Sequence, residues 1–127
     1  DNSAVNAMHH YPNETPFADK VLFADFNLDQ CNLTAMDGPG NHAYTFNEAV
    51  SFVVDCDTQE EIDYYWNKLT EGGAESMCGW LKDKFGVSWQ IVPAILGKLM
   101  SDPEKAPRVV QAFMQMKKFD IQKLLDA

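Results

Sequence analysis

The chain has 127 residues, of which 46% are hydrophobic and 23% are charged, and this composition predicts one packed globular domain and excludes a disordered or fibrous protein. Nineteen Asp and Glu against ten Lys and Arg give a net charge of −9, and that sign repels phosphate backbones and anionic lipid. We therefore expect neither a nucleic-acid partner nor a membrane partner.

The cysteine pattern gives no sign of a stapled or metal-bound fold. Cys31, Cys56 and Cys78 form no C-x-x-C pair, which argues against a disulfide framework and against a zinc knuckle. No signal-like start is present, and no segment approaches the roughly 20 apolar residues that span a bilayer. These features favour a cytoplasmic protein.

The N-terminal part predicts a loop followed by a hairpin. The first twenty residues are polar and contain Pro12 and Pro16, which favours an irregular exposed segment. Residues 21–28 and 31–36 are rich in strand formers and are separated by two residues. That spacing predicts a β-hairpin.

The middle of the chain predicts a strand followed by a helix. Residues 50–56 have the composition of a strand that is buried on at least one face. A capping box can then start a helix, either from Asp57 with Glu60 or from Thr58 with Glu61. Bulky apolar residues follow at helical spacing and predict one buried face: Ile62, Tyr65, Trp66 and Leu69.

A second hairpin and a helical tail complete the chain. Residues 77–82 and 87–92 flank a turn in which Gly86 needs a positive φ. Beyond them, the apolar spacing predicts short helices, one capped by Ser101 or Asp102 and the last by Asp120. The apolar stripe of this tail is expected to pack inside the protein, over a sheet edge, or against a partner subunit.

Motifs of familiar enzyme classes are missing. There is no P-loop, no G-x-S-x-G and no H-E-x-x-H, and Gly38-Pro39-Gly40 does not precede a helix start. We interpret His9, His10 and His42 as solvent-exposed loop side chains. The sequence thus argues against Rossmann-type nucleotide binding, serine hydrolysis and helix-borne zinc proteolysis.

The polar positions on two predicted strands are the candidates for a binding site. Ser88 and Gln90 alternate with apolar residues on one strand, and Ser51 begins the alternation on the other. If the strands are neighbours, Ser51 and Gln90 project from the same face. They then either form the polar rim of a mostly apolar pocket or satisfy each other's hydrogen bonds.

Three segments carry a resemblance to a known family. They are residues 78–93 (CGWLKDKFGVSWQIVP), residues 46–52 (FNEAVSF) and residues 58–63 (TQEEID). Together they resemble the PhnB-like branch of the glyoxalase, bleomycin-resistance and extradiol-dioxygenase superfamily, also called vicinal oxygen chelate. The resemblance runs from about Ser3 to Pro93.

The resemblance implies an α+β fold of paired βαβββ modules around a concave cavity, commonly in a homodimer. On this basis residues 1–127 form a single glyoxalase-like domain with three parts. Residues 1–46 are the remnant of a first module that lacks its initial strand and helix, residues 47–93 are the second module, and residues 94–127 are the helical tail.

The resemblance also suggests a function, although the metal ligands of the superfamily are not matched. Where its metal-using members have His or Gln and Glu, this sequence has Ser51 and Gln90, which bring no charge to a divalent ion. We therefore expect no cofactor, and a small, partly apolar ligand bound by Ser51, Trp80, Ser88 and Gln90. The alternatives are a metal-dependent lyase or dioxygenase and a dimeric interaction module without a ligand.

Overall fold

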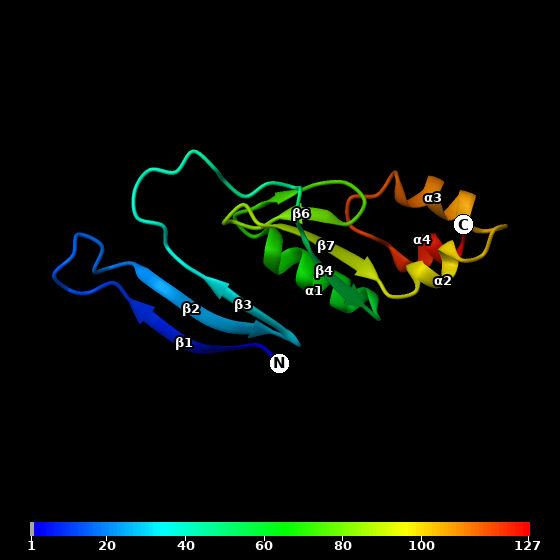
Figure 1. Cartoon of the computed structure of the whole chain (residues 1–127). Coiled ribbons are helices and arrows are strands. Elements are labelled where there is room, and N and C mark those ends of the chain that lie inside the picture. The colour runs from blue at the N-terminus through cyan, green and yellow to red at the C-terminus, as the bar shows by residue number, and fades with distance from the viewer. Residues whose placement is uncertain (1) are drawn as a thin grey trace. The chain divides into compact units, whose positions relative to one another are not determined.

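A computed structural model describes residues 2–127 and divides the chain into two compact units, Asp1–Tyr44 and Thr45–Ala127 (Figure 1). The single-domain interpretation, with parts at 1–46, 47–93 and 94–127, stays a prediction. No helix in the described residues combines the length and hydropathy needed to cross a membrane.

The first unit is a three-stranded antiparallel sheet in the order β1-β2-β3. Its strands are β1 (Ala4–His10), β2 (Val21–Leu28) and β3 (Cys31–Ala35). The predicted hairpin is confirmed: Leu28 pairs with Cys31 across the turn, where Asp29 has a φ of 52°. Asp is one of the few non-glycine residues that tolerate this left-handed conformation.

The interpretation of the first twenty residues as a loop was wrong for residues 4–10, which form β1, and is confirmed for residues 11–20, which form turns. Six residues of β1 are exposed and Ala7 alone is half-buried. A strand with little burial on either face needs no alternation of apolar and polar residues, so the period-2 signal is absent. The ring of His9 stacks on Phe23 of β2 at 4.5 Å.

The second unit contains a complete βαβββ module. Its elements are β4 (Phe52–Cys56), α1 (Gln59–Thr70), β5 (Ala74–Glu75), β6 (Trp80–Lys82) and β7 (Ser88–Pro93). The sheet order is β4-β7-β6-β5, and β4 runs parallel to β7 while the other pairs are antiparallel. The predicted α+β fold class is confirmed.

Helix α1 starts as one of the two predicted capping boxes. Thr58 Oγ1 accepts a hydrogen bond from the N–H of Glu61 at 3.2 Å, and Glu61 reaches back to the N–H of Asp57 at 2.7 Å. The first contact satisfies an N–H group that the first turn leaves free, and the second fixes the residue that precedes the N-cap. Ile62 and Trp66 are buried as expected, whereas Tyr65 lies at the margin of the apolar face and is exposed.

The second hairpin forms around Gly86, which has the predicted positive φ of 85°. Strand β6, however, begins at Trp80 rather than at Met77. Cys78 and Gly79 have φ values of 57° and 80°, and left-handed residues cannot continue a strand. The sequence pattern could not show that conformation at a cysteine.

The tail forms the three short helices α2 (Leu96–Met100), α3 (Ala106–Phe113) and α4 (Ile121–Leu125). Asp120 caps α4 as predicted, by accepting from the N–H of Lys123. Asp102, one of the two predicted caps, caps the turn that leads into α3, because its Oδ1 accepts from the N–H groups of Glu104 at 3.0 Å and Lys105 at 3.3 Å. Its carbonyl accepts from the N–H of Ala106 at 2.8 Å, and the regular helix begins at Ala106. Pro107 has no N–H to complete an earlier turn.

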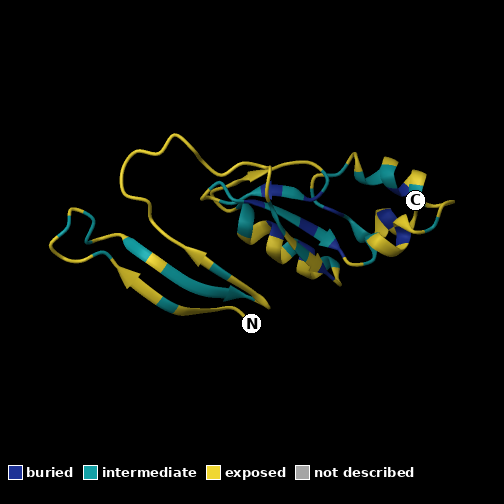
Figure 2. Cartoon of the chain, viewed as in Figure 1, coloured by how far each residue is buried: buried dark blue, intermediate teal, exposed yellow. Residues whose placement is uncertain are grey.

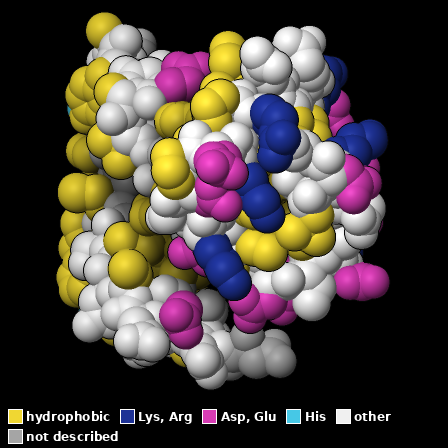
Figure 3. Space-filling view, turned by 90° about the vertical axis from the view of Figure 1, so that its right-hand side faces the viewer, with side chains coloured by type: hydrophobic (Ala, Val, Ile, Leu, Met, Phe, Trp, Pro, Cys, Tyr) yellow, Lys and Arg dark blue, Asp and Glu magenta, His cyan; other side chains and the backbone are white. Residues whose placement is uncertain are grey.

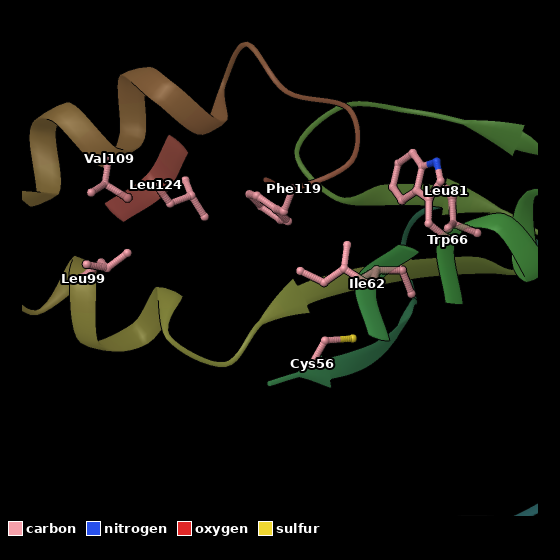
Figure 4. Packing of buried hydrophobic residues seen from close by; sticks show 9 residues of the cluster. Cys56, Ile62, Trp66, Leu81, Leu99, Val109, Phe119 and Leu124 are labelled. Carbon is pink, nitrogen blue, oxygen red and sulfur yellow. The ribbon is translucent and has the colours of Figure 1, made fainter. Parts of the chain in front are cut away.

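The hydrophobic core lies entirely in the second unit and includes the tail (Figure 4). Phe119 lies between the α1 side of the core, near Ile62, and the tail residues Val109 and Leu124. Figure 2 shows buried segments along β7 and in the tail helices. The view onto the end that carries α2–α4 shows basic and acidic side chains interspersed with apolar ones (Figure 3). The tail's apolar stripe therefore packs within its own unit.

Candidate ligand groove

The two faces of the second sheet have different roles. Trp89 and Ile91 belong to the core beneath α1, and the Trp89 ring lies 5.0 Å from that of Phe52. Because side chains alternate along a strand, Ser88 and Gln90 project from the opposite face. Their cross-strand partners on β6, Lys82 and Trp80, share that face.

A groove of about 420 Å³ opens beside β5, β6 and β7. This volume lies within the usual range for small-molecule sites, roughly 300–1,000 Å³. Strands and the segment before β4 both contribute to its walls. The lining residues are Glu48, Ala74, Glu75, Ser76, Trp80, Leu81, Lys82 and Ser88.

Ser88 is the unusual member of this lining. It is 1% exposed, although it lies on the sheet face opposite the hydrophobic core. Its Oγ has no hydrogen-bond partner among residues 2–127. Buried polar groups in native proteins are almost always hydrogen-bonded, and one left unpaired costs about 1–3 kcal/mol. Because Ser88 also lines the groove, a ligand that displaces the atoms covering its hydroxyl would supply the missing partner.

The charges around the groove are engaged by other groups. Glu48 forms an ion pair with Lys82, whose hydrogen bond lowers the pKa of the Glu48 carboxyl. Glu75 accepts from Trp66 Nε1 at 3.0 Å and from Lys117 Nζ at 3.2 Å. The Trp66 hydrogen bond is the main cause of the lowered pKa of Glu75. Both carboxyl groups are therefore ionised at neutral pH.

Gln90 and Ser51 form a separate polar pair on the same face of the sheet. Gln90 Nε2 donates to Ser51 Oγ at 2.9 Å. Of the two possibilities that the sequence left open, the structure shows the mutual hydrogen bond. Neither residue belongs to the lining of the groove.

Two of the four predicted site residues, Trp80 and Ser88, line the groove, and Ser51 and Gln90 lie outside it. Sequence reasoning missed the carboxylates Glu48 and Glu75 and the ammonium of Lys82. Lys82 was within reach, since it follows Trp80 by two residues and so shares its face. Glu48 comes from the irregular segment before β4 and Glu75 from the two-residue strand β5, and no periodic signal marks either of them.

Comparison with known proteins identifies the family of this chain. The family model of 3-demethylubiquinone-9 3-methyltransferase matches residues 1–92. The chain belongs to this family. None of the curated proteins matches it.

Solved structures of this fold support the family assignment. A protein from Bacillus cereus, named "Putative 3-demethylubiquinone-9 3-methyltransferase, PhnB protein", is 36% identical, with a TM-score of 0.69 over 74% of this chain and 81% of that chain. Protein PA1353 from Pseudomonas aeruginosa is 23% identical, with a TM-score of 0.60 over 71% of this chain and 77% of that chain. The second likeness concerns the fold alone.

The residues present do not fit a divalent metal ion, which the superfamily resemblance implies. The Gln90–Ser51 pair offers a neutral amide and a neutral hydroxyl, whereas divalent ions in proteins are held by imidazole, thiolate or carboxylate groups. Within residues 2–127, no three His, Cys, Asp or Glu side chains cluster with a geometry that suits a metal ion.

The start of α1 does not match a site for the methyl donor that the family's description implies. The connection between β4 and α1 is short and ends in an acidic first turn with Glu60 and Glu61. Nucleotide-type cofactors usually lie over a glycine-rich loop at such a helix start, where backbone N–H groups are free. Here Thr58 and Glu61 already occupy those positions.

Proposed function

We propose that this member of the 3-demethylubiquinone-9 3-methyltransferase family binds a small, partly apolar molecule in the groove beside β5, β6 and β7. The observation that carries the proposal is the buried, unpartnered hydroxyl of Ser88 at the groove wall. Trp80 supplies an aromatic surface two strand positions from Lys82. The groove combines apolar surface with polar and charged side chains, and a mixture of the two kinds is found in ligand sites.

The glyoxalase-like superfamily is the wider group to which we assign the chain. The β4-α1-β5-β6-β7 order, with β4 parallel to β7, supports this assignment. The assignment concerns architecture, because one fold hosts many unrelated chemistries. The function rests on the groove instead.

A thermal-shift screen of metabolites tests the proposal. A molecule that binds the folded state raises the midpoint of unfolding by mass action. We expect at least one such shift in the wild-type protein and its reduction in Ser88→Ala. The matched control is Ser101→Ala, since the Ser101 hydroxyl donates to Gly97 O on an exposed helix end.

Two outcomes would contradict the proposal. One is a shift that Ser88→Ala and Ser101→Ala leave equally unchanged, which would place the ligand elsewhere. The other is a stoichiometric transition metal in the purified protein, bound through Gln90, which would favour a metal-dependent reaction. Gln90→Ala separates the two sites, because the groove does not include Gln90.

A further inference from the structure

The charges of the groove wall limit the kind of ligand it can take. Two carboxylates, Glu48 and Glu75, line it against one ammonium, Lys82. An anion would have to displace Glu48 from Lys82 and would still face both carboxylates. Since like charges repel, the two carboxylates disfavour an anionic ligand in the groove.

A cationic ligand meets a different obstacle. Lys82 already forms an ion pair with Glu48, and Trp66 and Lys117 already donate hydrogen bonds to Glu75. A cation would exchange one partly exposed ion pair for another, and such pairs contribute little. The net charge of −9 attracts cations at long range, but physiological salt screens exposed charges beyond about 8 Å.

The group that lacks a partner in the wall is neutral. A serine hydroxyl offers one donor and two acceptor lone pairs, which suit a carbonyl, amide or hydroxyl. Ser88 is buried, so a ligand atom that reaches it leaves water behind, and an uncharged atom loses less hydration than an ion. Trp80 beside it favours a flat apolar part.

We propose that the groove selects an uncharged ligand, with a carbonyl, amide or hydroxyl on Ser88 Oγ and a planar apolar part against Trp80. This inference rests on the proposed function and adds the chemical class of the ligand. The Glu48–Lys82 and Glu75–Lys117 pairs already compensate the charges of the wall, so a charged ligand gains little by replacing either pair.

Three probes of nearly identical shape test the charge selection: benzamide, benzoate and benzamidine, which are neutral, anionic and cationic at neutral pH. Each is titrated into the isotope-labelled full chain at physiological salt, and the amide signals of residues 74–76, 80–82 and 88 and the Trp80 indole signal are followed. We expect benzamide to bind about threefold or more tightly than either charged probe, and Ser88→Ala to weaken benzamide by a similar factor. Ser101→Ala is the control and should change nothing.

The outcomes distinguish the inference from the proposed function. If benzoate or benzamidine shifts the groove signals at equal or lower concentration than benzamide, the groove is a ligand site but the charge selection is wrong. If none of the three shifts those signals, the groove does not take an uncharged planar molecule of this kind and the inference is overturned, whereas the thermal-shift screen decides the proposed function. Equal binding of benzamide to wild type and Ser88→Ala would remove the hydroxyl from the contact.

Discussion

The amide of Gln59 holds the backbone on both sides of Asp120, about sixty residues away in the chain. Its Nε2 donates to the carbonyl of Phe119 at 3.0 Å, and its Oε1 accepts from the N–H of Ile121 at 2.9 Å. A side-chain amide here takes the place of a neighbouring strand. The first turn of α1 is thus fixed to the start of α4.

Gln59→Ala should lower the free energy of unfolding by about 1–3 kcal/mol, because two partly buried backbone groups lose their partner. Urea denaturation measures the loss. The control is Gln122→Ala, whose amide contacts only the exposed Asp126, and which should stay within about 0.5 kcal/mol of wild type. Equal effects in the two variants would show that the clamp contributes nothing.

Gly79→Ala should destabilise the protein far more than Gly86→Ala. Both glycines have a φ near 80° to 85°, so both substitutions carry a left-handed penalty of about 1–2 kcal/mol. A Cβ on Gly79 would also collide with the Phe119 ring and the Ile91 carbonyl, whereas Gly86 has open space around it. We expect a total loss of about 2–5 kcal/mol at Gly79. Similar unfolding midpoints for the two variants would contradict this account.

Ser88→Ala should leave the ligand-free protein as stable as wild type or up to about 1 kcal/mol more stable, because an unpaired buried hydroxyl is removed. Chemical denaturation without added ligand provides the measurement. A loss of more than about 1 kcal/mol in the free energy of unfolding would mean that the hydroxyl has a hydrogen-bond partner in solution. Ser88 would then offer no unpaired hydroxyl to a ligand.

Cys56 should resist alkylation in the folded protein. Burial raises its pKa to about 11, and the nearby charges of Glu61, Asp55 and Asp57 add to the shift. The thiol is therefore protonated at pH 8, and thiolate is the reactive form. Mass spectrometry after iodoacetamide at pH 8 should find Cys31, which is exposed, modified well before Cys56.

The same pKa gives a pH dependence of stability. The ordinary pKa is 9.0 and the folded value is higher, so the thiol's contribution is present below pH 9 and is lost as the pH rises through 11. Cys56→Ser should flatten the fall in stability over that window. Rapid alkylation of Cys56 in the native protein would contradict both expectations.

The homodimer expected from the resemblance can be checked by light scattering. Within the described residues, each sheet ends in strands that pair on one side only, β1 and β3 in one and β4 and β5 in the other. Unpaired strand edges favour association with a second copy. We expect a particle of twice the 14.3 kDa chain mass; a concentration-independent monomer would refute the dimer.

Local signals in the sequence predicted most of the second unit. The Thr58 and Glu61 cap, the positive φ at Gly86 and the alternation around Trp89 each depend on neighbours within a few residues. Strand β1 escaped because its side chains are mostly exposed and carry no apolar period. The left-handed Cys78 escaped because its conformation is set by the tail, whose Met116 carbonyl accepts from the Cys78 N–H at 2.7 Å.

The site was predictable only in part for the same reason. Trp80 and Ser88 follow from strand alternation, but the isolation of the Ser88 hydroxyl is a property of the whole packed unit. The contact between Glu48 and Lys82 joins segments more than thirty residues apart. Tertiary structure brings such pairs together, and no spacing rule in the sequence predicts them.

The position of Phe119 bears on how fragments of this protein would behave. The family match stops at residue 92, yet Leu99, Val109, Phe119 and Leu124 complete the interior over Ile62 and Ile91. A fragment that ends at residue 92 would expose an apolar surface on α1 and β7 and would tend to aggregate. A fragment defined by sequence similarity alone would therefore lack the tail helices that cover the apolar face of its module.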